Sequence, residues 1–135
     1  MIFAIKADIP DAYAETFVLP AHKTMYGGRR IAAGDTVFLF ARDGGLCARG
    51  EVVAAEAVPK RPGVARQTPR VNVTVRRTAL ATRLLGRREL KPFDQWRDGR
   101  PETELNFKFY RQATNKIVAL SAEAASFLDA CFSVR

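Results

Sequence analysis

The stretch that decides the fold is GDTVFLFARDGG, residues 34–45, with the run LCARGEVVAAEAVP, residues 46–59, that follows it. The Gly-Asp pair opens a strand with Val, Leu and Ala on one face and two Phe on the other. The Asp-Gly-Gly sequence then supplies residues that reach positive φ at low cost in a tight turn. The return run is rich in small and β-branched residues and is long enough to bend around a barrel. Residues 34–59 therefore predict one long β-hairpin.

Other apolar and alternating runs predict the rest of a small β-rich fold. Residues 70–77 alternate, with three valines on one face and polar side chains on the other, which indicates a half-exposed strand. Three more segments read as strands: 1–6, 106–110 and 116–120. Ser121 can cap a final helix, which carries apolar residues at three-and-four spacing. We expect an α+β fold of five or six strands with a C-terminal helix.

The connecting segments are predicted as follows. Pro10 suits the first turn of a short helix over residues 10–17. Residues 19–30 are polar and are expected to be irregular, and residues 59–69 hold three prolines and are expected to form a loop. Residues 78–90 are predicted to be irregular or partly helical. No repeat or linker interrupts the chain, so residues 1–135 are expected to form a single domain.

Composition limits the compartment. The chain has 135 residues, 47% of them hydrophobic, and no apolar run near the roughly 20 residues that span a bilayer. The N-terminal residues lack the pattern of a signal peptide and read as a strand instead. The two cysteines, Cys47 and Cys131, are expected to be buried thiols in a reducing compartment. These features favour a cytoplasmic protein without a membrane partner.

The positive charge is concentrated in the middle of the sequence. Residues 60–100 hold twelve Lys or Arg against three acidic residues, a net charge of +9, whereas the whole chain carries +8. Such a surface attracts polyanions and makes their binding salt-dependent. The alternative is a solvated, solubilising loop face. The arginines expected to contact a nucleic-acid backbone are Arg70, Arg76, Arg77, Arg83, Arg87 and Arg88.

Little in the sequence points to an enzyme. The single histidine, His22, has no Cys, Asp or Glu set with metal-ligand spacing nearby, and it is expected to be a surface or hydrogen-bonded loop residue. Glu102 and Glu104 lie close together but are expected to be solvated on a loop. Neither cysteine lies in a CxxC motif, and no phosphate-binding glycine loop occurs. We therefore expect no catalytic residue, no metal and no cofactor.

Aromatic residues suggest a binding site. Planar bases stack on aromatic rings, which contributes about 1–3 kcal/mol per base. Trp96 and Tyr110 lie near basic or amide residues, which favours a ligand-facing role as much as a place in the core. The polar side chains that can hydrogen-bond a base edge are those of Asn106, Gln112, Thr114 and Asn115.

Two parts of the sequence resemble a known family. Residues 26–30, YGGRR, followed by GDTVFLF at 34–40, resemble the entry to the long hairpin of EVE domains in the PUA-like superfamily, to which ASCH and YTH domains are related. The run from Gly50 to Val53 resembles the return of that hairpin. Residues 106–121 and the helix after them resemble the end of the same fold. The similarity covers most of the chain.

The resemblance implies a PUA-like pseudo-β-barrel of mostly antiparallel strands with short flanking helices and a pocket at its mouth. EVE domains are associated with recognising modified bases in DNA or RNA. Carried onto matching positions, the resemblance places Lys23, Tyr26, Gly27, Arg29 and Phe40 in the pocket, with Trp96 in a segment that aligns less closely. His22 and Lys23 stand where EVE domains usually carry a tryptophan.

The function expected from the sequence is a non-enzymatic nucleic-acid-binding module. A pocket takes one base, modified or not, while the basic surface contacts phosphates. The alternative is a domain that senses a small molecule or nucleotide with the same pocket. An enzyme using His22 or the pair Glu102 and Glu104 is a further alternative. The chain is expected to be a monomer or a weak homodimer.

Overall fold

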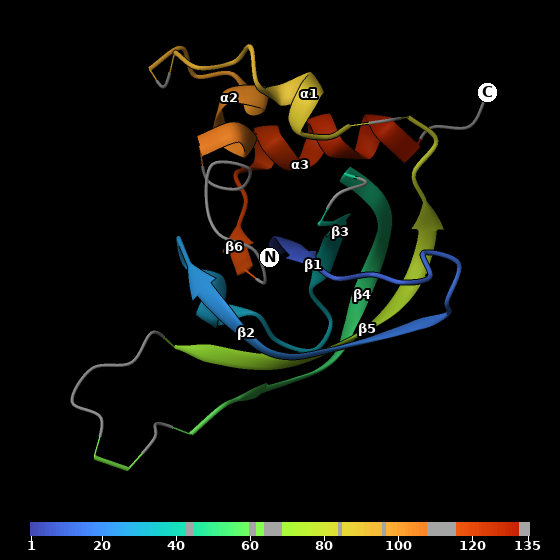
Figure 1. Ribbon diagram of the computed structural model, residues 1–135, viewed down its shortest axis with the longest axis vertical. Coiled ribbons are helices and arrows are strands. Elements are labelled where there is room, and N and C mark those ends of the chain that lie inside the picture. Colours follow the sequence, from blue (N-terminus) through green and yellow to red (C-terminus); the bar gives the residue numbers. More distant parts are fainter. Residues whose placement is uncertain are drawn as a thin grey trace.

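The structure is a computed structural model that describes residues 1–42, 45–59, 62–63, 69–83, 85–95, 97–107 and 116–132, with only the backbone of residue 87. Its strands are β1 (Ile2–Ala7), β2 (Thr16–Met25), β3 (Thr36–Ala41), β4 (Gly45–Ala57), β5 (Arg70–Leu80) and β6 (Lys116–Ala119). Its helices are α1 (Arg87–Leu90), α2 (Pro101–Leu105) and α3 (Ala122–Asp129). The short 3₁₀ turns are η1 (Gly28–Arg30) and η3 (Ala130–Phe132). Figure 1 shows the strands below a layer of helices.

The six strands close into a barrel in the order β1-β3-β4-β5-β2-β6. Four neighbouring pairs are antiparallel, whereas β1 with β3 and β2 with β6 are parallel. The hairpin predicted over residues 34–59 forms β3 and β4, and the alternating segment 70–77 lies within β5. The predicted α+β barrel is confirmed.

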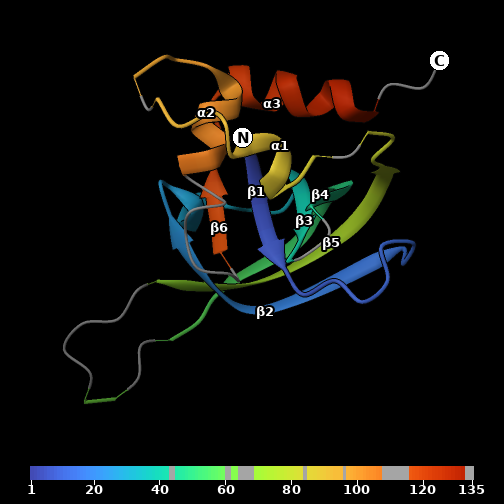
Figure 2. The same ribbon diagram turned by 45° about the horizontal axis from the view of Figure 1, so that its top comes forward.

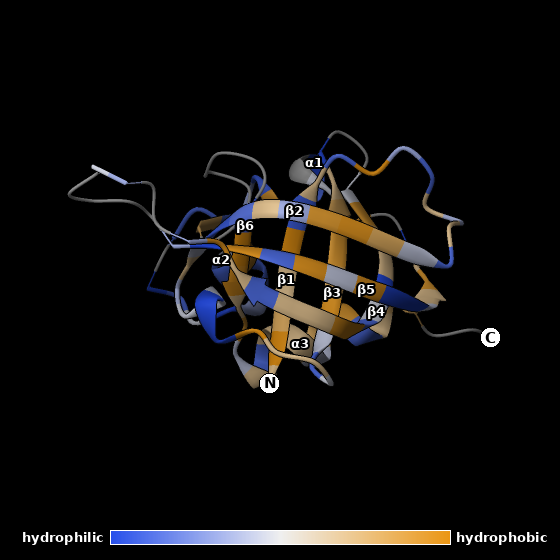
Figure 3. Ribbon diagram, turned by 90° about the horizontal axis from the view of Figure 1, so that it is seen from below, coloured by the Kyte–Doolittle hydropathy of each residue, from blue (hydrophilic) through white to orange (hydrophobic). Residues whose placement is uncertain are grey.

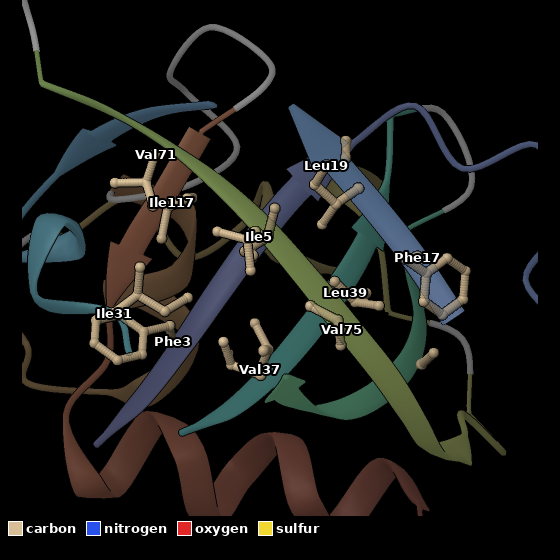
Figure 4. Packing of buried hydrophobic residues seen from close by; sticks show 14 residues of the cluster. Phe3, Ile5, Phe17, Leu19, Ile31, Val37, Leu39, Val71, Val75 and Ile117 are labelled. Atoms are coloured by element: carbon tan, nitrogen blue, oxygen red, sulfur yellow. The ribbon is translucent and has the colours of Figure 1, made fainter. Parts of the chain in front are cut away.

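Two hydrophobic clusters hold the fold together. The first fills the barrel with alternate residues of the strands, among them Phe3, Val37 and Val75, whose side chains converge between the strands in Figure 4. The second lies between the outer face of the barrel and the helices, where Phe38 and Leu128 are completely buried. Figures 1 and 2 both show α3 in the helical layer above β1, β3 and β6. Strands β1 and β3 are therefore buried on both faces, which explains why they contain continuous apolar runs.

The other side of the barrel, formed by β2, β5 and β4, faces solvent. Figure 3 views this side and shows hydrophobic and hydrophilic residues alternating along the strands. In β5 the three valines of the predicted alternation, at 71, 73 and 75, are buried, and Asn72 and Arg76 between and beside them are exposed. Valine and polar residues alternate in the sequence of β5 because only one face of this strand is buried.

The predictions for residues 10–30 are wrong. No helix forms over 10–17, because Thr16 already begins β2, which runs through the supposedly irregular segment to Met25. The register against β5 shifts between Leu19 and His22, and Ala21 has a positive φ of 51°. This bulge changes which residues face inward, so the sequence of β2 does not keep one period of alternation.

The strand predicted over residues 106–110 does not begin at Asn106. Pro101 occupies the first turn of α2, and Asn106 continues it with φ −60° and ψ −50°. The remaining residues of that prediction, 108–110, lie outside the described residues. Glu104 is not solvated on a loop, because its carboxylate accepts hydrogen bonds from the backbone N–H and hydroxyl of Ser121. Ser121 also caps α3 as predicted, its Oγ accepting from the N–H of Ala124 at 3.1 Å.

Both cysteines are free thiols. Cys131 is buried and Cys47 is half-buried, and burial raises the pKa of each thiol above its ordinary value. Both are therefore protonated near neutral pH, which suits packing rather than nucleophilic chemistry. No helix within the described residues is long and apolar enough to cross a membrane.

Candidate nucleic-acid interface

Four basic residues lie side by side across four neighbouring strands. Lys6 of β1 pairs with Lys116 of β6, Lys116 pairs with Lys23 of β2, and Lys23 pairs with Arg70 of β5. We call these four residues the basic row. Because neighbouring strands lie about 4.8 Å apart, the row spans roughly 14 Å. The closure of the barrel thus brings together cations from four separate parts of the sequence.

The row is buried at one end and exposed at the other. Lys6 and Lys116 are only 7% and 5% exposed to solvent, whereas Lys23 is exposed and Arg70 is half-buried. Strand alternation puts Lys116 on the same face as Val118, which packs in the cluster beneath the helices. The two lysine side chains therefore project from the outer face of the barrel but are shielded from solvent.

Backbone hydrogen bonds hold the start of β5 against β2. The carbonyl oxygen of Pro69 accepts from the N–H of Thr24 at 3.0 Å and from its Oγ1 at 2.9 Å. The carbonyl of Arg70 accepts from the N–H of Val58 at 2.9 Å. Arg70 is thereby fixed beside Lys23. Its buried Nε has no hydrogen-bond partner among the described residues.

The cations of the row affect one another. Burial lowers the pKa of Lys116, and the positive charge of the neighbouring Lys23 lowers it further. Both causes disfavour the charged ammonium. Within the described residues no group of three or more His, Cys, Asp or Glu side chains could hold a metal ion.

The turn after β2 carries an exposed aromatic ring, Tyr26, three residues beyond Lys23 of the row. Tyr26 is 48% exposed and has φ 51°, and Gly27 follows with φ 84°. Gly28 then packs so closely on β6 that a Cβ there would lie 2.1 Å from the carbonyl oxygen of Ile117. Arg29 follows in η1 and is exposed. Residues 23–29 thus present an ammonium, a phenol ring and a guanidinium to solvent along the β2–β6 seam.

The predicted pocket residues have different outcomes. Lys23, Tyr26, Gly27 and Arg29 lie together at this seam, where β2 passes into η1. Phe40 does not, because it is completely buried in the cluster under the helices. That prediction is wrong. Both faces of β3 are covered, so neither set of alternate side chains along this strand is exposed to a ligand. Trp96, Tyr110 and Asn115 lie outside the described residues, as do the polar positions 112 and 114. Asn106 is described and buried, and its side-chain amide donates to the carbonyl of Phe93 at 3.0 Å.

The predicted arginines do not form one patch. Arg70 and Arg76 lie six residues apart on β5, about 20 Å along an extended strand. Arg76 pairs with Glu51 at 3.1 Å, and Arg77 donates to the carbonyl oxygens of Ala14 and Tyr13. Arg83 and Arg88 are exposed beyond β5, and the side chain of Arg87 is outside the described part. Among the predicted arginines in the described strands, Arg70 is the one that pairs with Lys23.

The sequence analysis missed Lys6 and Lys116. A lysine at the end of the apolar run FAIKA and another at the start of KIVA were available as a signal, because a charged residue inside a buried strand is unusual. Strand pairing, which the sequence does not display, is what makes them neighbours.

His22 is buried in β2 and not on the surface. It is 5% exposed, and its Nδ1 lies 2.9 Å from the carbonyl oxygen of Pro20, to which it donates. Its Nε2 is buried with no hydrogen-bond partner in the described part of the chain. Burial is the main cause that lowers the pKa of His22, and the bond to Pro20 opposes it. The imidazole is therefore neutral in the folded protein near pH 7.

Acidification should destabilise the protein through His22. Because its pKa is lower in the folded state, the unfolded chain binds more protons below about pH 6.5, the ordinary value, so stability falls as the pH drops. The slope is at most about 1.4 kcal/mol per pH unit. Urea unfolding between pH 7.5 and 5.5 should show this loss in the native protein and a smaller one in His22→Gln. Equal slopes in the two proteins would contradict the assignment, and no other histidine complicates the comparison.

The closed six-stranded mixed barrel with its C-terminal helix is a PUA-like fold, the class that the resemblance to EVE domains implied. Among solved structures, the chain is similar to the DUF55 domain of human thymocyte nuclear protein 1, with a TM-score of 0.66 and 18% identity over 100% of both chains. Human THYN1 protein in complex with DNA containing 5-methylcytosine gives the same TM-score and identity over 99% of this chain and 98% of that one. A hypothetical protein from Leishmania major is similar with a TM-score of 0.60 and 18% identity, over 96% and 92% of the two chains.

No protein-family model matches the sequence, and no curated protein is significantly similar to it. The likeness to the solved structures therefore establishes the fold.

Proposed function

We propose that the chain is a non-enzymatic nucleic-acid-binding module in which residues 1–135 act as one EVE-like domain. One base, extruded from its stack, lies at the β2–β6 seam against Tyr26. Lys23, Arg29 and Arg70 contact the backbone on either side. The observation that carries the proposal is that the exposed ring of Tyr26 follows three residues after the exposed Lys23, which pairs with Arg70 on the neighbouring strand.

Charged contacts and stacking contacts contribute differently to binding. Phosphate contacts provide affinity and register, whereas contacts with the base provide selectivity. Extruding a base costs a few kcal/mol, and stacking on a tyrosine returns about 1–3 kcal/mol. Gly27 follows the ring with φ 84°, a conformation that glycine adopts at low cost, and this turn fixes where Tyr26 leaves β2.

The solved structures support the same kind of ligand. The DNA complex of the human protein shows that a barrel of this fold takes DNA containing 5-methylcytosine. We propose a DNA or RNA base, modified or unmodified, as the ligand here. Trp96, Tyr110 and Asn115 remain proposed members of the same pocket, and Arg83, Arg87 and Arg88 remain proposed outer contacts with the backbone.

Binding of short oligonucleotides tests this function. Fluorescence anisotropy with labelled strands, with and without 5-methylcytosine, should show affinity that falls as salt rises. Tyr26→Ala should weaken binding about tenfold or more, as expected for loss of one stacked base. Lys23→Ala should weaken it several-fold and reduce the salt dependence.

The matched control is Lys91→Ala, which removes the same charge from an exposed position after α1, away from the seam. It should bind within about twofold of the native protein, because an exposed charge at a distance is screened. Binding that is absent, or that is insensitive to salt and to Tyr26→Ala, would overturn the proposal.

A nucleotide-sensing domain is the second candidate function. The same exposed ring of Tyr26 and the same exposed ammonium of Lys23 would hold one free nucleotide. Calorimetry should then detect binding of deoxycytidine 5′-monophosphate where anisotropy detects no binding of oligonucleotides.

A further inference from the structure

Strand β2, on the side of the barrel that Figure 3 views, contains a bulge that decides which of its side chains face solvent. The register against β5 shifts after Leu19, so that two residues of β2, Pro20 and Ala21, share one place in the ladder, opposite Asn72. Leu19 is buried before the bulge, and the next buried residue is His22, three positions later. The bulge therefore inverts the alternation of the strand.

This inversion puts a cation at the surface. Continued alternation from Leu19 would bury residues 21 and 23 and expose residue 22. In the structure Lys23 is exposed and His22 is buried instead. An ammonium group turned into the apolar barrel would be more costly than a neutral imidazole. The bulge is therefore what presents Lys23 to solvent, three residues before Tyr26.

The backbone of this segment is strained at both ends. Ala21 and Tyr26 both have φ 51°, and they are the only non-glycine residues with positive φ in the described part of the chain. Such strain persists where surrounding contacts hold it, and it is often found at binding sites. Tyr26 lies in a turn, where positive φ is common. Ala21 lies in the middle of a strand, so a contact from outside its own segment has to hold it.

Asn72 provides that contact. Its side-chain Oδ1 accepts a hydrogen bond from the backbone N–H of Ala21 at 2.7 Å. Pro20 has no N–H, so Ala21 is the backbone donor of the bulge. Asparagine is depleted from strands because its side chain competes for backbone hydrogen bonds, and here that competition satisfies the extra residue.

From these contacts we infer that Asn72 is a positioning residue of the candidate interface: it holds the bulge at Ala21, and the bulge presents Lys23 to the ligand. The inference rests on the proposed function for the ligand, but the effect of Asn72 on the strand can be measured without one. Asn72 lies in none of the segments that resemble EVE domains, and its role follows from strand pairing.

The single histidine reports the register of β2. His22 follows the bulge directly, and burial keeps its pKa below the ordinary value. If Asn72→Ala releases the bulge, His22 becomes exposed to solvent, and its pKa, measured by NMR titration, should rise towards about 6.5. The control is Thr74→Ala, at the next outward-facing position of β5. It should leave the pKa of His22 unchanged.

Anisotropy with oligonucleotides gives the functional readout. Asn72→Ala should weaken binding several-fold, as Lys23→Ala does, whereas Thr74→Ala should bind like the native protein. The double variant should bind within about twofold of Lys23→Ala, because a residue that acts through Lys23 adds nothing once this lysine is removed. Additive losses would show that Asn72 contacts the ligand itself and would contradict the positioning role.

Ala21→Gly separates the strain from the hydrogen bond. Glycine adopts φ 51° without a steric penalty, so the bulge should depend less on Asn72 when residue 21 is glycine. Adding Ala21→Gly to Asn72→Ala should therefore recover most of the affinity and lower the pKa of His22 again. Absence of any recovery would contradict the link through Ala21.

The outcomes distinguish this inference from the proposed function. If no oligonucleotide binds the native protein, the proposed function fails, and the pKa of His22 decides whether Asn72 sets the register. If oligonucleotides bind but Asn72→Ala changes neither the affinity nor this pKa, the inference is wrong and the proposed function stands. A raised pKa with unchanged affinity would also overturn the inference, because the bulge would then not matter to the ligand.

Discussion

Replacing Gly28 with alanine is expected to lower the free energy of unfolding by about 3 kcal/mol, near the upper end for overpacking. A Cβ at this position would lie 2.1 Å from the carbonyl oxygen and 2.7 Å from the carbonyl carbon of Ile117. Both are backbone atoms of β6, so no side chain can rotate to make room. Because η1 must then move away from β6, Tyr26 should also lose its position beside the basic row.

Gly34→Ala is the matched control. Gly34 has φ 95° but nothing within 4 Å of an added Cβ, so alanine there meets only the backbone strain of the left-handed region. That strain costs about 1 kcal/mol. Chemical unfolding of the two variants should rank Gly28→Ala well below Gly34→Ala. Equal losses would show that η1 does not press on β6 as described.

Phe40→Ala is expected to destabilise the protein by about 3–5 kcal/mol, the usual cost of deleting a fully buried aromatic side chain. Phe40 is 0% exposed and belongs to the cluster between the barrel and the helices. Its removal leaves a cavity in the cluster that also contains Leu128 of α3 and Val118 of β6. Urea unfolding monitored by circular dichroism measures the loss.

The control for Phe40→Ala is Tyr13→Ala, at an aromatic residue that is 75% exposed before β2. Its stability should change by less than about 0.5 kcal/mol, as for most surface substitutions. If Phe40→Ala were instead nearly neutral in stability but weakened oligonucleotide binding, Phe40 would be a ligand contact after all. A large stability loss is consistent only with the buried position described.

The elements that were predicted best are those whose sequence pattern depends on interactions between residues close together in the chain. The Asp-Gly-Gly turn between two strands, the alternating valines of β5 and the capping hydroxyl of Ser121 each reflect an interaction within a few residues. Strand β2 was missed because Pro20, His22 and Lys23 interrupt its apolar residues, and the bulge at Ala21 changes its parity. The helix α2 was missed because the apparent alternation after Asn106 outweighed the helix start at Pro101.

The candidate site was predictable only where its residues are neighbours in the sequence. Lys23, Tyr26 and Arg29 lie within seven residues, where β2 passes into η1, and the resemblance to EVE domains found them together. Lys6 and Lys116 are 110 positions apart and become neighbours only through the pairing of β1 with β6. Conversely, the arginine-rich segment is contiguous in sequence, but the length of β5 separates Arg70 from Arg76 and Arg77, and the remaining arginines follow after the strand. Charge density along a chain does not predict charge density on a surface.

The pairing of β1 with β6 has a consequence for synthesis on the ribosome. Phe3 of β1 lies opposite Ala119 of β6. One edge of β1 is therefore covered only after β6 has been synthesised. Until then β1 has only β3 as a partner, and its open edge can pair with other chains. Barrel closure therefore has to wait for the synthesis of β6, and one edge of β1 stays unpaired until then. Chaperones that hold unpaired strands would be expected to affect the yield of this protein more than its final stability.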